Sequence, residues 1–122
     1  MNVETFYDNK TATFTYVLFD PISKECGVID SVADYDIFSG RVSMESADKV
    51  IAFINDKQLI NQWILETHVH ADHITAAHYL KSKVGGKIGI GSGIKEVLDT
   101  WLDVFEISND TPNDGSQFDV LF

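Results

Sequence analysis

Three of the chain's four histidines lie in one short stretch, Thr67-His68-Val69-His70-Ala71-Asp72-His73, which also holds an aspartate. The apolar run Trp63-Ile64-Leu65 precedes this stretch and predicts a short buried strand, whereas Ile74-Thr75-Ala76-Ala77 follows it and opens a helical pattern. The histidines are therefore expected on a strand-to-helix turn.

The residue types and their spacing predict a metal site. In extended backbone, side chains two positions apart point to the same side, so His68 and His70 can face one ion together. Asp72 and His73 follow from the turn and the first helical residues, where the positive end of the helix dipole favours an ionised carboxylate. Imidazole and carboxylate ligands suit zinc, iron or manganese. A thiolate site is excluded, because Cys26 is the only cysteine.

A simpler interpretation is a histidine-rich turn that binds metal by accident, or whose histidines cap backbone groups. The aspartate and the third histidine beside the His68-x-His70 pair favour the metal site. His78 is set apart, because its distance of five residues from His73 places it on another face of the expected helix. We expect His78 at the surface or in helix packing.

The motif also carries a resemblance to a known family. His68-x-His70-x-Asp72-His73 matches the HxHxDH motif of the metallo-β-lactamase fold, and residues 66–77 look most like its persulfide dioxygenase branch, with glyoxalase II the next closest relative. The similarity extends to residues 13–18, 27–31 and 87–91, so it covers nearly the whole chain. It implies an α/β fold in which a mixed sheet is layered with helices.

In that family the remaining metal ligands lie well downstream of HxHxDH, in a TPGHT-like segment and a later Gly-Asp pair. This sequence has no histidine after His78, and Pro112 is followed by Asn113 where the family has Gly-His. We therefore expect residues 1–122 to form a single, apparently truncated domain, equivalent to the N-terminal half of a two-lobed αββα sandwich.

For function, the resemblance implies a persulfide dioxygenase with one non-haem Fe2+, which binds glutathione persulfide and dioxygen and yields sulfite and glutathione. His68 would be the iron ligand from this part of the enzyme. The alternative is a glyoxalase II-like thioester hydrolase with two zinc ions and a bridging water, in which His68 and His70 bind one ion and Asp72 and His73 the other. A third hypothesis is a half-domain without catalysis, serving in metal binding or association.

Three further residues are candidates for roles around this centre. Tyr35 and Arg41 lie in residues 31–45, which have no stable period and are expected to form a long loop. The resemblance implies that loops around the metal hold a small thiol-derived substrate, and an arginine can pair with the carboxylates of glutathione persulfide. Asp30, at the end of a predicted strand, is expected either to orient a ligand histidine or to cap a turn.

Composition limits the class of protein and its partners. The 122 residues, 44% of them hydrophobic, are enough to bury one core. A net charge of −10 repels polyphosphate backbones, so no nucleic-acid partner is expected. The N-terminus has no secretory pattern and no run is long enough to span a membrane, so a cytoplasmic protein without a membrane partner is expected. The single Cys26 fits a reducing compartment and is expected in the core.

Periodicity predicts strands alternating with helices, which argues for α/β layers. The strands are expected at residues 3–7, 13–19, 26–30 and 118–122, and a polar turn segment at residues 108–116. Helices are expected from about Ser46, acting as N-cap, to Lys57, from near Asp72 to Gly85-Gly86, and after Gly93.

The third expected helix has a strong apolar stripe, which is expected to pack in the core. Its members are Ile94, Val97, Leu98, Trp101, Leu102 and Phe105. An apolar surface or strand edge left bare beside it would favour self-association, with Phe122 near the contact.

Overall fold

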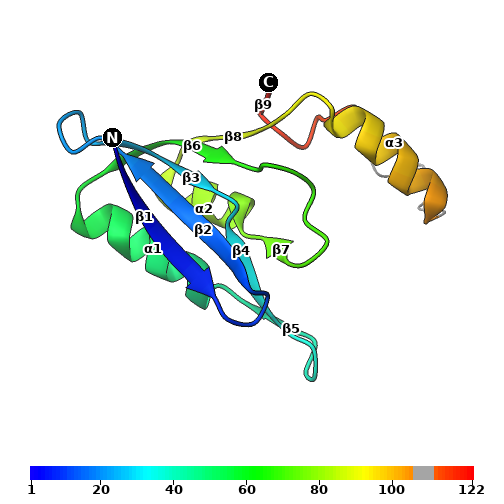
Figure 1. Ribbon diagram of the computed structural model, residues 1–122, viewed down its shortest axis with the longest axis horizontal. Helices are drawn as coiled ribbons and strands as arrows, with labels where there is room; N and C mark the ends of the chain where they lie inside the picture. The colour runs from blue at the N-terminus through cyan, green and yellow to red at the C-terminus, as the bar shows by residue number, and fades with distance from the viewer. Residues whose placement is uncertain (106–111) are drawn as a thin grey trace.

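The computed structural model describes residues 1–105 and 112–122, which form an α/β fold (Figure 1). The strands are β1 (Asn2–Asp8), β2 (Thr13–Phe19), β3 (Glu25–Ile29), β4 (Val32–Asp36), β5 (Arg41–Ser43), β6 (Ile60–Leu65), β7 (Ile74–Thr75), β8 (Lys87–Ile90) and β9 (Val120–Leu121). The helices are α1 (Glu45–Asp56), α2 (Ala77–Val84) and α3 (Ile94–Val104). The predicted fold class is confirmed.

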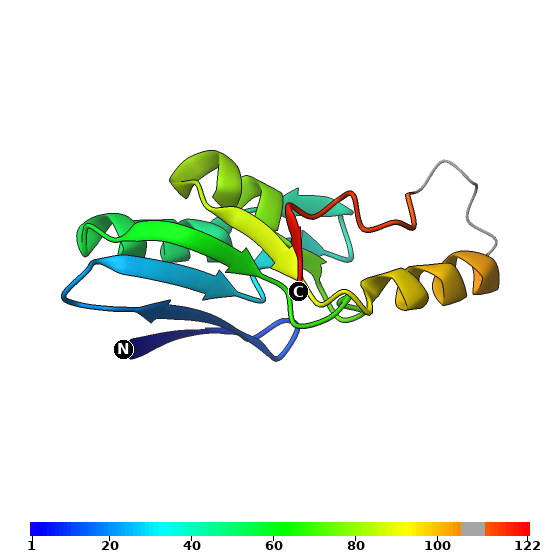
Figure 2. The ribbon, with the colours of Figure 1, turned by 90° about the horizontal axis from the view of Figure 1, so that it is seen from above.

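Six strands form the main sheet, in the order β1-β2-β3-β6-β8-β9. The pairs β1-β2 and β2-β3 are antiparallel, whereas β3, β6, β8 and β9 run parallel to one another. Figure 2 shows α1 and α2 together on one face of this mixed sheet. Because β3, β6 and β8 are parallel, their carboxyl ends meet at one edge, which is where ligands bind in open α/β sheets. The histidine-rich stretch leaves β6 at that edge.

The hydrophobic core lies between the sheet and these two helices. Its fully buried side chains come from strands and helices alike: Val17, Val28, Ile64, Ile88, Val50, Ile54 and Leu80. Burying a side chain of this size stabilises the fold by about 1.5–3 kcal/mol. Cys26 is buried in the core, as predicted, and its thiol lies 3.7 Å from the side-chain oxygen of Asn61.

The expectation of a long loop at residues 31–45 is wrong, because this segment contains β4 and β5. The two strands pair antiparallel, and β4 also pairs with β7, which makes a small second sheet. The turn between them is held by Asp36, whose carboxylate accepts hydrogen bonds from the N–H groups of Phe38 and Ser39 at 2.9 and 3.3 Å. The strands are short and their polar residues do not alternate cleanly, so the sequence lacks the period of a strand.

The first helix begins within one residue of the predicted start, but its predicted N-cap is wrong, and so is the predicted start of the second helix. The N-cap position of α1 is Met44, and Ser46 lies inside the helix, where its N–H and hydroxyl donate to the carboxylate of Asp34 at 2.7 and 2.8 Å. The second helix begins at Ala77 and not near Asp72, because Ile74–Thr75 pair with β4 as β7. Its end at Gly85 is as predicted, with a positive φ of 71° that glycine adopts at low cost.

The expectation that the apolar stripe of α3 packs in the core is wrong. Ile94 is buried, but Trp101 and Phe105 are 49% and 64% exposed. Both views show α3 extending away from the sheet (Figure 1, Figure 2). Periodicity identifies an amphipathic helix, but it does not identify the surface that the helix covers.

The C-terminal strand is present but shorter than predicted, since β9 contains only Val120–Leu121. Its pairing with β8 brings Phe122 against Gly89, where an added Cβ would lie 2.6 Å from the phenyl ring. The predicted polar turn at residues 108–116 begins outside the described residues. None of the described helices is long and apolar enough to cross a membrane.

Candidate metal centre

Residues 66–73 form an irregular loop that connects β6 to β7 and gathers three imidazoles. The ring centroids of His68 and His70 are 4.4 Å apart, and those of His70 and His73 are 4.1 Å apart. The sequence therefore predicted correctly that these histidines lie together, although the backbone between them is not a regular strand. His78 is exposed on α2, as expected.

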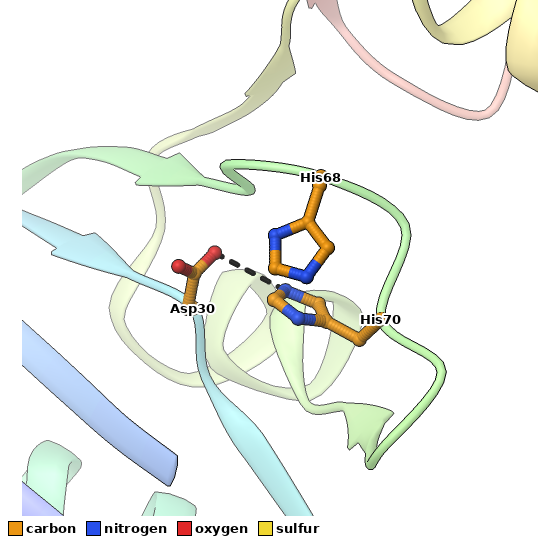
Figure 3. A group of neighbouring side chains, drawn as sticks. All are labelled: Asp30, His68 and His70. Carbon is orange, nitrogen blue, oxygen red and sulfur yellow. Dashed lines mark hydrogen bonds and ion pairs between the residues drawn. The ribbon is translucent and has the colours of Figure 1, made fainter.

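One possible ligand group combines Asp30 with His68 and His70, each offering one atom within 4.8 Å of the others (Figure 3). Asp30 directly follows β3, and its carboxylate lies 3.1 Å from Nε2 of His70. The same carboxylate accepts hydrogen bonds from the backbone N–H and the hydroxyl of Thr67, both at 2.8 Å. Asp30 thus contacts a histidine of the motif and also holds the loop that carries it.

A second group consists of His70, Asp72 and His73, again within 4.8 Å of one another. Oδ1 of Asp72 lies 4.0 Å from Nδ1 of His70 and 3.3 Å from Nδ1 of His73. The side chain of His73 is only 1% exposed, and among the described residues neither of its nitrogens has a hydrogen-bond partner, although Nδ1 lies 3.3 Å from the carboxylate of Asp72.

The unpartnered nitrogens of His73 fit a metal ion. A buried polar group without a partner costs about 1–3 kcal/mol, and coordination to a cation would remove this cost. Burial, followed by the nearby imidazole of His70, lowers the pKa of His73. The ring is therefore kept neutral, which is the form that binds metals.

Glu66 also belongs to this cluster, although the HxHxDH motif, which begins at His68, does not include it. It is buried at the end of β6, and its Oε2 lies 2.8 Å from Nε2 of His70. Its other oxygen accepts a hydrogen bond of 2.5 Å from the hydroxyl of Thr75. Burial raises the pKa of Glu66, and the hydrogen bonds from Thr75 and His70 oppose that rise. The sequence signal was a carboxylate directly after an apolar strand and four positions before His70.

The two predicted substrate-binding residues occupy different positions. Tyr35 lines a cavity of about 870 Å³ together with Lys10, Asp72 and His73, so it lies beside the candidate centre. Arg41 is exposed on β5 and does not line this cavity. A second cavity, of about 700 Å³, lies between His68, His70 and the apolar face of α3.

Comparison with known proteins relates the chain to a probable metallo-hydrolase, a glyoxylase and a persulfide dioxygenase, although no family model matches it. A probable metallo-hydrolase of Burkholderia pseudomallei is 50% identical over 99% of this chain and 41% of its own length. Glyoxylase B2 of Dictyostelium discoideum is 44% identical over 98% of this chain and 41% of its own length. The mitochondrial persulfide dioxygenase ETHE1 of Bos taurus is 28% identical over 78% of this chain and 33% of its own length.

Solved structures show the same fold. The crystal structure of ETHE1 from Myxococcus xanthus has a TM-score of 0.60 and 26% identity, covering 73% of this chain and 35% of that one. BLEG-1, a B3 metallo-β-lactamase, has a TM-score of 0.64 and 22% identity, covering 99% of this chain and 53% of that one. The chain spans about two fifths of the length of the metallo-hydrolase and the glyoxylase. The HxHxDH loop, the mixed sheet that positions it and these similarities show that the chain belongs to the metallo-β-lactamase-fold superfamily.

Proposed function

We propose that this chain supplies metal ligands of a persulfide dioxygenase that oxidises a small thiol-derived substrate, such as glutathione persulfide, to sulfite. The observation that supports this proposal is the composition of the two ligand groups. Each combines two imidazoles with one carboxylate, which is the donor set of non-haem Fe2+ oxygenases. Both groups contain His70, and a neutral imidazole has one nitrogen lone pair, so the described residues favour one ion at a time.

In this proposal the residues of the chain have distinct roles. His68 is the candidate iron ligand from this part of the enzyme, His70, Asp72 and His73 are the further candidate metal ligands, and the metal would supply the redox chemistry with dioxygen when bound. Asp30 orients His70 through its 3.1 Å contact. The cavity beside Asp72 and His73 would receive the substrate, because Lys10 and Tyr35 line it and offer an ammonium and a hydroxyl to a carboxylate.

A glyoxalase II-like thioester hydrolase is the second candidate, and the relatives support it. The metallo-hydrolase and the glyoxylase are 50% and 44% identical to this chain, compared with 28% for the bovine persulfide dioxygenase. In this case His68 and His70 would hold one zinc ion, and Asp72 and His73 would hold the other. The two metals would activate a water for attack on the thioester.

The two candidates differ in metal count and in the second reactant. The protein would be loaded with Fe2+ without oxygen, or with Zn2+, and its metal content measured. Oxygen uptake and sulfite formation would then be followed with glutathione persulfide, and thiol release with S-lactoylglutathione. One iron per chain with oxygen uptake supports the dioxygenase, and two zinc ions with thiol release support the hydrolase. Bound metal without turnover of either substrate would support a metal-binding module.

A further inference from the structure

We infer that the β4–β5 hairpin makes the cavity beside Asp72 and His73 selective for a thiol-derived ligand with one carboxylate and an apolar substituent. In this assignment Ile37 and Phe38, at the tip of the hairpin, contact the substituent, and Lys10 pairs with the carboxylate. The inference rests on the proposed function, because it concerns the cavity that would receive the substrate, and it narrows the class of substrate that fits there.

Three segments of the chain form the walls of this cavity, which has a volume of about 870 Å³. The histidine loop and β7 supply residues 70–74. The turn between β1 and β2 supplies Lys10 and Thr11, and the hairpin supplies residues 35–38. Figure 1 shows this hairpin projecting beyond the main sheet. A ligand bound at the candidate metal centre from this side would therefore lie between the histidine loop and the hairpin.

The tip of the hairpin carries two apolar side chains that the described part of the protein leaves uncovered. Ile37 is 74% exposed and Phe38 is 96% exposed, and both line the cavity. Tyr35 and Ile74 line the same cavity and are about half exposed, so the apolar surface extends from the tip to β7. Contact with an apolar group would remove this surface from water, which favours a ligand that carries such a group.

Hydrogen bonds of the turn hold the two apolar side chains in place. The carboxylate of Asp36 accepts the N–H groups of Phe38 and Ser39, and its backbone carbonyl accepts the N–H of Gly40 at 2.8 Å. The bond from Phe38, followed by that from Ser39, lowers the pKa of Asp36, so this carboxylate stays ionised near neutral pH. A surface that is already ordered loses little conformational entropy when a ligand binds to it.

The charges around the cavity favour a ligand with a single carboxylate. Apart from the imidazoles, Lys10 is the only basic side chain among the described residues that line it. Its ammonium forms no ion pair within residues 1–105 and 112–122, where the lysine that does so is Lys81. The two lining carboxylates are engaged elsewhere, Asp36 in its own turn and Asp72 beside the imidazoles. Glutathione has two carboxylates and a polar peptide backbone, so it would leave one carboxylate without a lysine and the hairpin tip without an apolar partner.

Two thiol acids that differ by one group test the inference. Thiolactate and 2-sulfanyl-3-phenylpropanoate share the thiol and the carboxylate, and only the second has a phenyl group. Titration followed by 1H–15N NMR, with and without Zn2+, measures both affinities. We expect the phenyl compound to bind about 10-fold more tightly in either case, because its ring contacts the hairpin tip and is removed from water.

This experiment separates the inference from the proposed function. Equal affinities for the two compounds, or no binding of the phenyl compound, would overturn the inference. If the preference for the phenyl compound were present but Zn2+ changed neither affinity, the inference would be supported and the proposed metal centre would be contradicted. The measurement needs no turnover, so it is also independent of the activity assays.

The variant Phe38→Ala tests the apolar contact at a position where high exposure leaves the fold intact. We expect the preference to fall from about 10-fold to about 2-fold, with the affinity for thiolactate unchanged. The matched control is Ile22→Ala, which removes a 91% exposed side chain from the turn between β2 and β3 and should keep the full preference. A full preference in Phe38→Ala would refute the role of the hairpin tip.

The variant Lys10→Gln tests the charge. We expect it to weaken both thiol acids by about 3-fold, the effect of losing an exposed ion pair, without changing the preference between them. Lys87→Gln, at an exposed position of β8, is the matched control and should weaken neither compound. Unchanged affinities in Lys10→Gln would refute the pairing of Lys10 with the carboxylate.

Discussion

Asp30 accepts two hydrogen bonds from Thr67, one from its backbone N–H and one from its hydroxyl, each at 2.8 Å. These bonds join the end of β3 to the histidine loop across 37 residues of sequence. The backbone of Asp30 takes part as well, since its N–H donates to the carbonyl of Leu65 at 2.9 Å. Its φ of 52° is in the left-handed region, where aspartate is tolerated better than most residues. Asp30 thus attaches the histidine loop to the end of β3.

We expect Asp30→Ala to destabilise the fold by about 0.5–1.5 kcal/mol, because the N–H and hydroxyl of the exposed Thr67 lose their acceptor. Zn2+ affinity should fall about 10- to 100-fold as His70 loses a supporting carboxylate. Urea unfolding and calorimetric titration measure the two effects. Asp56→Ala, on the exposed end of α1, is the control and should change neither. Wild-type affinity in Asp30→Ala would show that the loop holds its shape without this contact.

Metal binding should depend most strongly on His70, because both ligand groups include it. We expect the protein to bind one Zn2+, His70→Ala to abolish binding, and exposed His78→Ala to leave it unchanged. Binding should weaken as the pH falls, because protons compete for the imidazoles. The lowered pKa of His73 means that this ligand stays available to a lower pH than an exposed histidine would. A second equivalent of bound Zn2+ would contradict the single-ion centre.

The sequence predicted the parts of this centre that depend on residues close to one another along the chain. The HxHxDH motif placed His68, His70, Asp72 and His73 on one loop, and the apolar residues before it predicted β6. Parallel strands then brought Asp30 to the same edge of the sheet, as its place at a strand end had suggested. These features follow from patterns within a few neighbouring residues.

The features that could not be predicted depend on contacts between distant residues. The start of α1 is held by Asp34, which lies twelve positions before Ser46, and not by a local cap. β7 exists because it pairs with β4, and two residues carry no periodic signal of their own. The contact between Glu66 and His70 depends on the fold of the loop, which turns the ring of His70 back toward the carboxylate of Glu66.

The contact between Asp34 and α1 gives a prediction for stability. Asp34→Ala should cost about 0.5–2 kcal/mol, the usual effect of removing a helix N-terminal acceptor. Ser46→Ala should cost less, because it removes the hydroxyl bond but keeps the bond from the backbone N–H. Thermal unfolding of both variants tests this order. If Ser46→Ala were the more damaging change, the carboxylate would not be the main stabiliser of the helix start.

The buried thiol of Cys26 should make the free energy of unfolding depend on pH in the alkaline range. Burial raises the pKa of its thiol from 9.0 to about 11, so the folded state retains a proton that the unfolded state loses. The contribution is complete below about pH 9 and is lost as the pH rises toward 11, with a total of about 3 kcal/mol. The slope of unfolding free energy against pH in this window should be shallower in Cys26→Ala. Equal slopes would show that the thiol ionises equally in both states.

The exposed apolar face of α3 gives a prediction about association. Trp101 and Phe105 stack with ring centroids 5.3 Å apart, and both are largely exposed on a helix that extends away from the sheet. Apolar surface of this kind favours contact with another molecule, because burial removes it from water. We expect the protein to self-associate at high concentration, and Trp101→Glu to shift it toward the monomer with little change in melting temperature. Light scattering measures the mass, and Thr100→Glu adds the same charge to the neighbouring exposed position as a control. A wild-type protein that remains monomeric at every concentration would show that α3 does not mediate self-association.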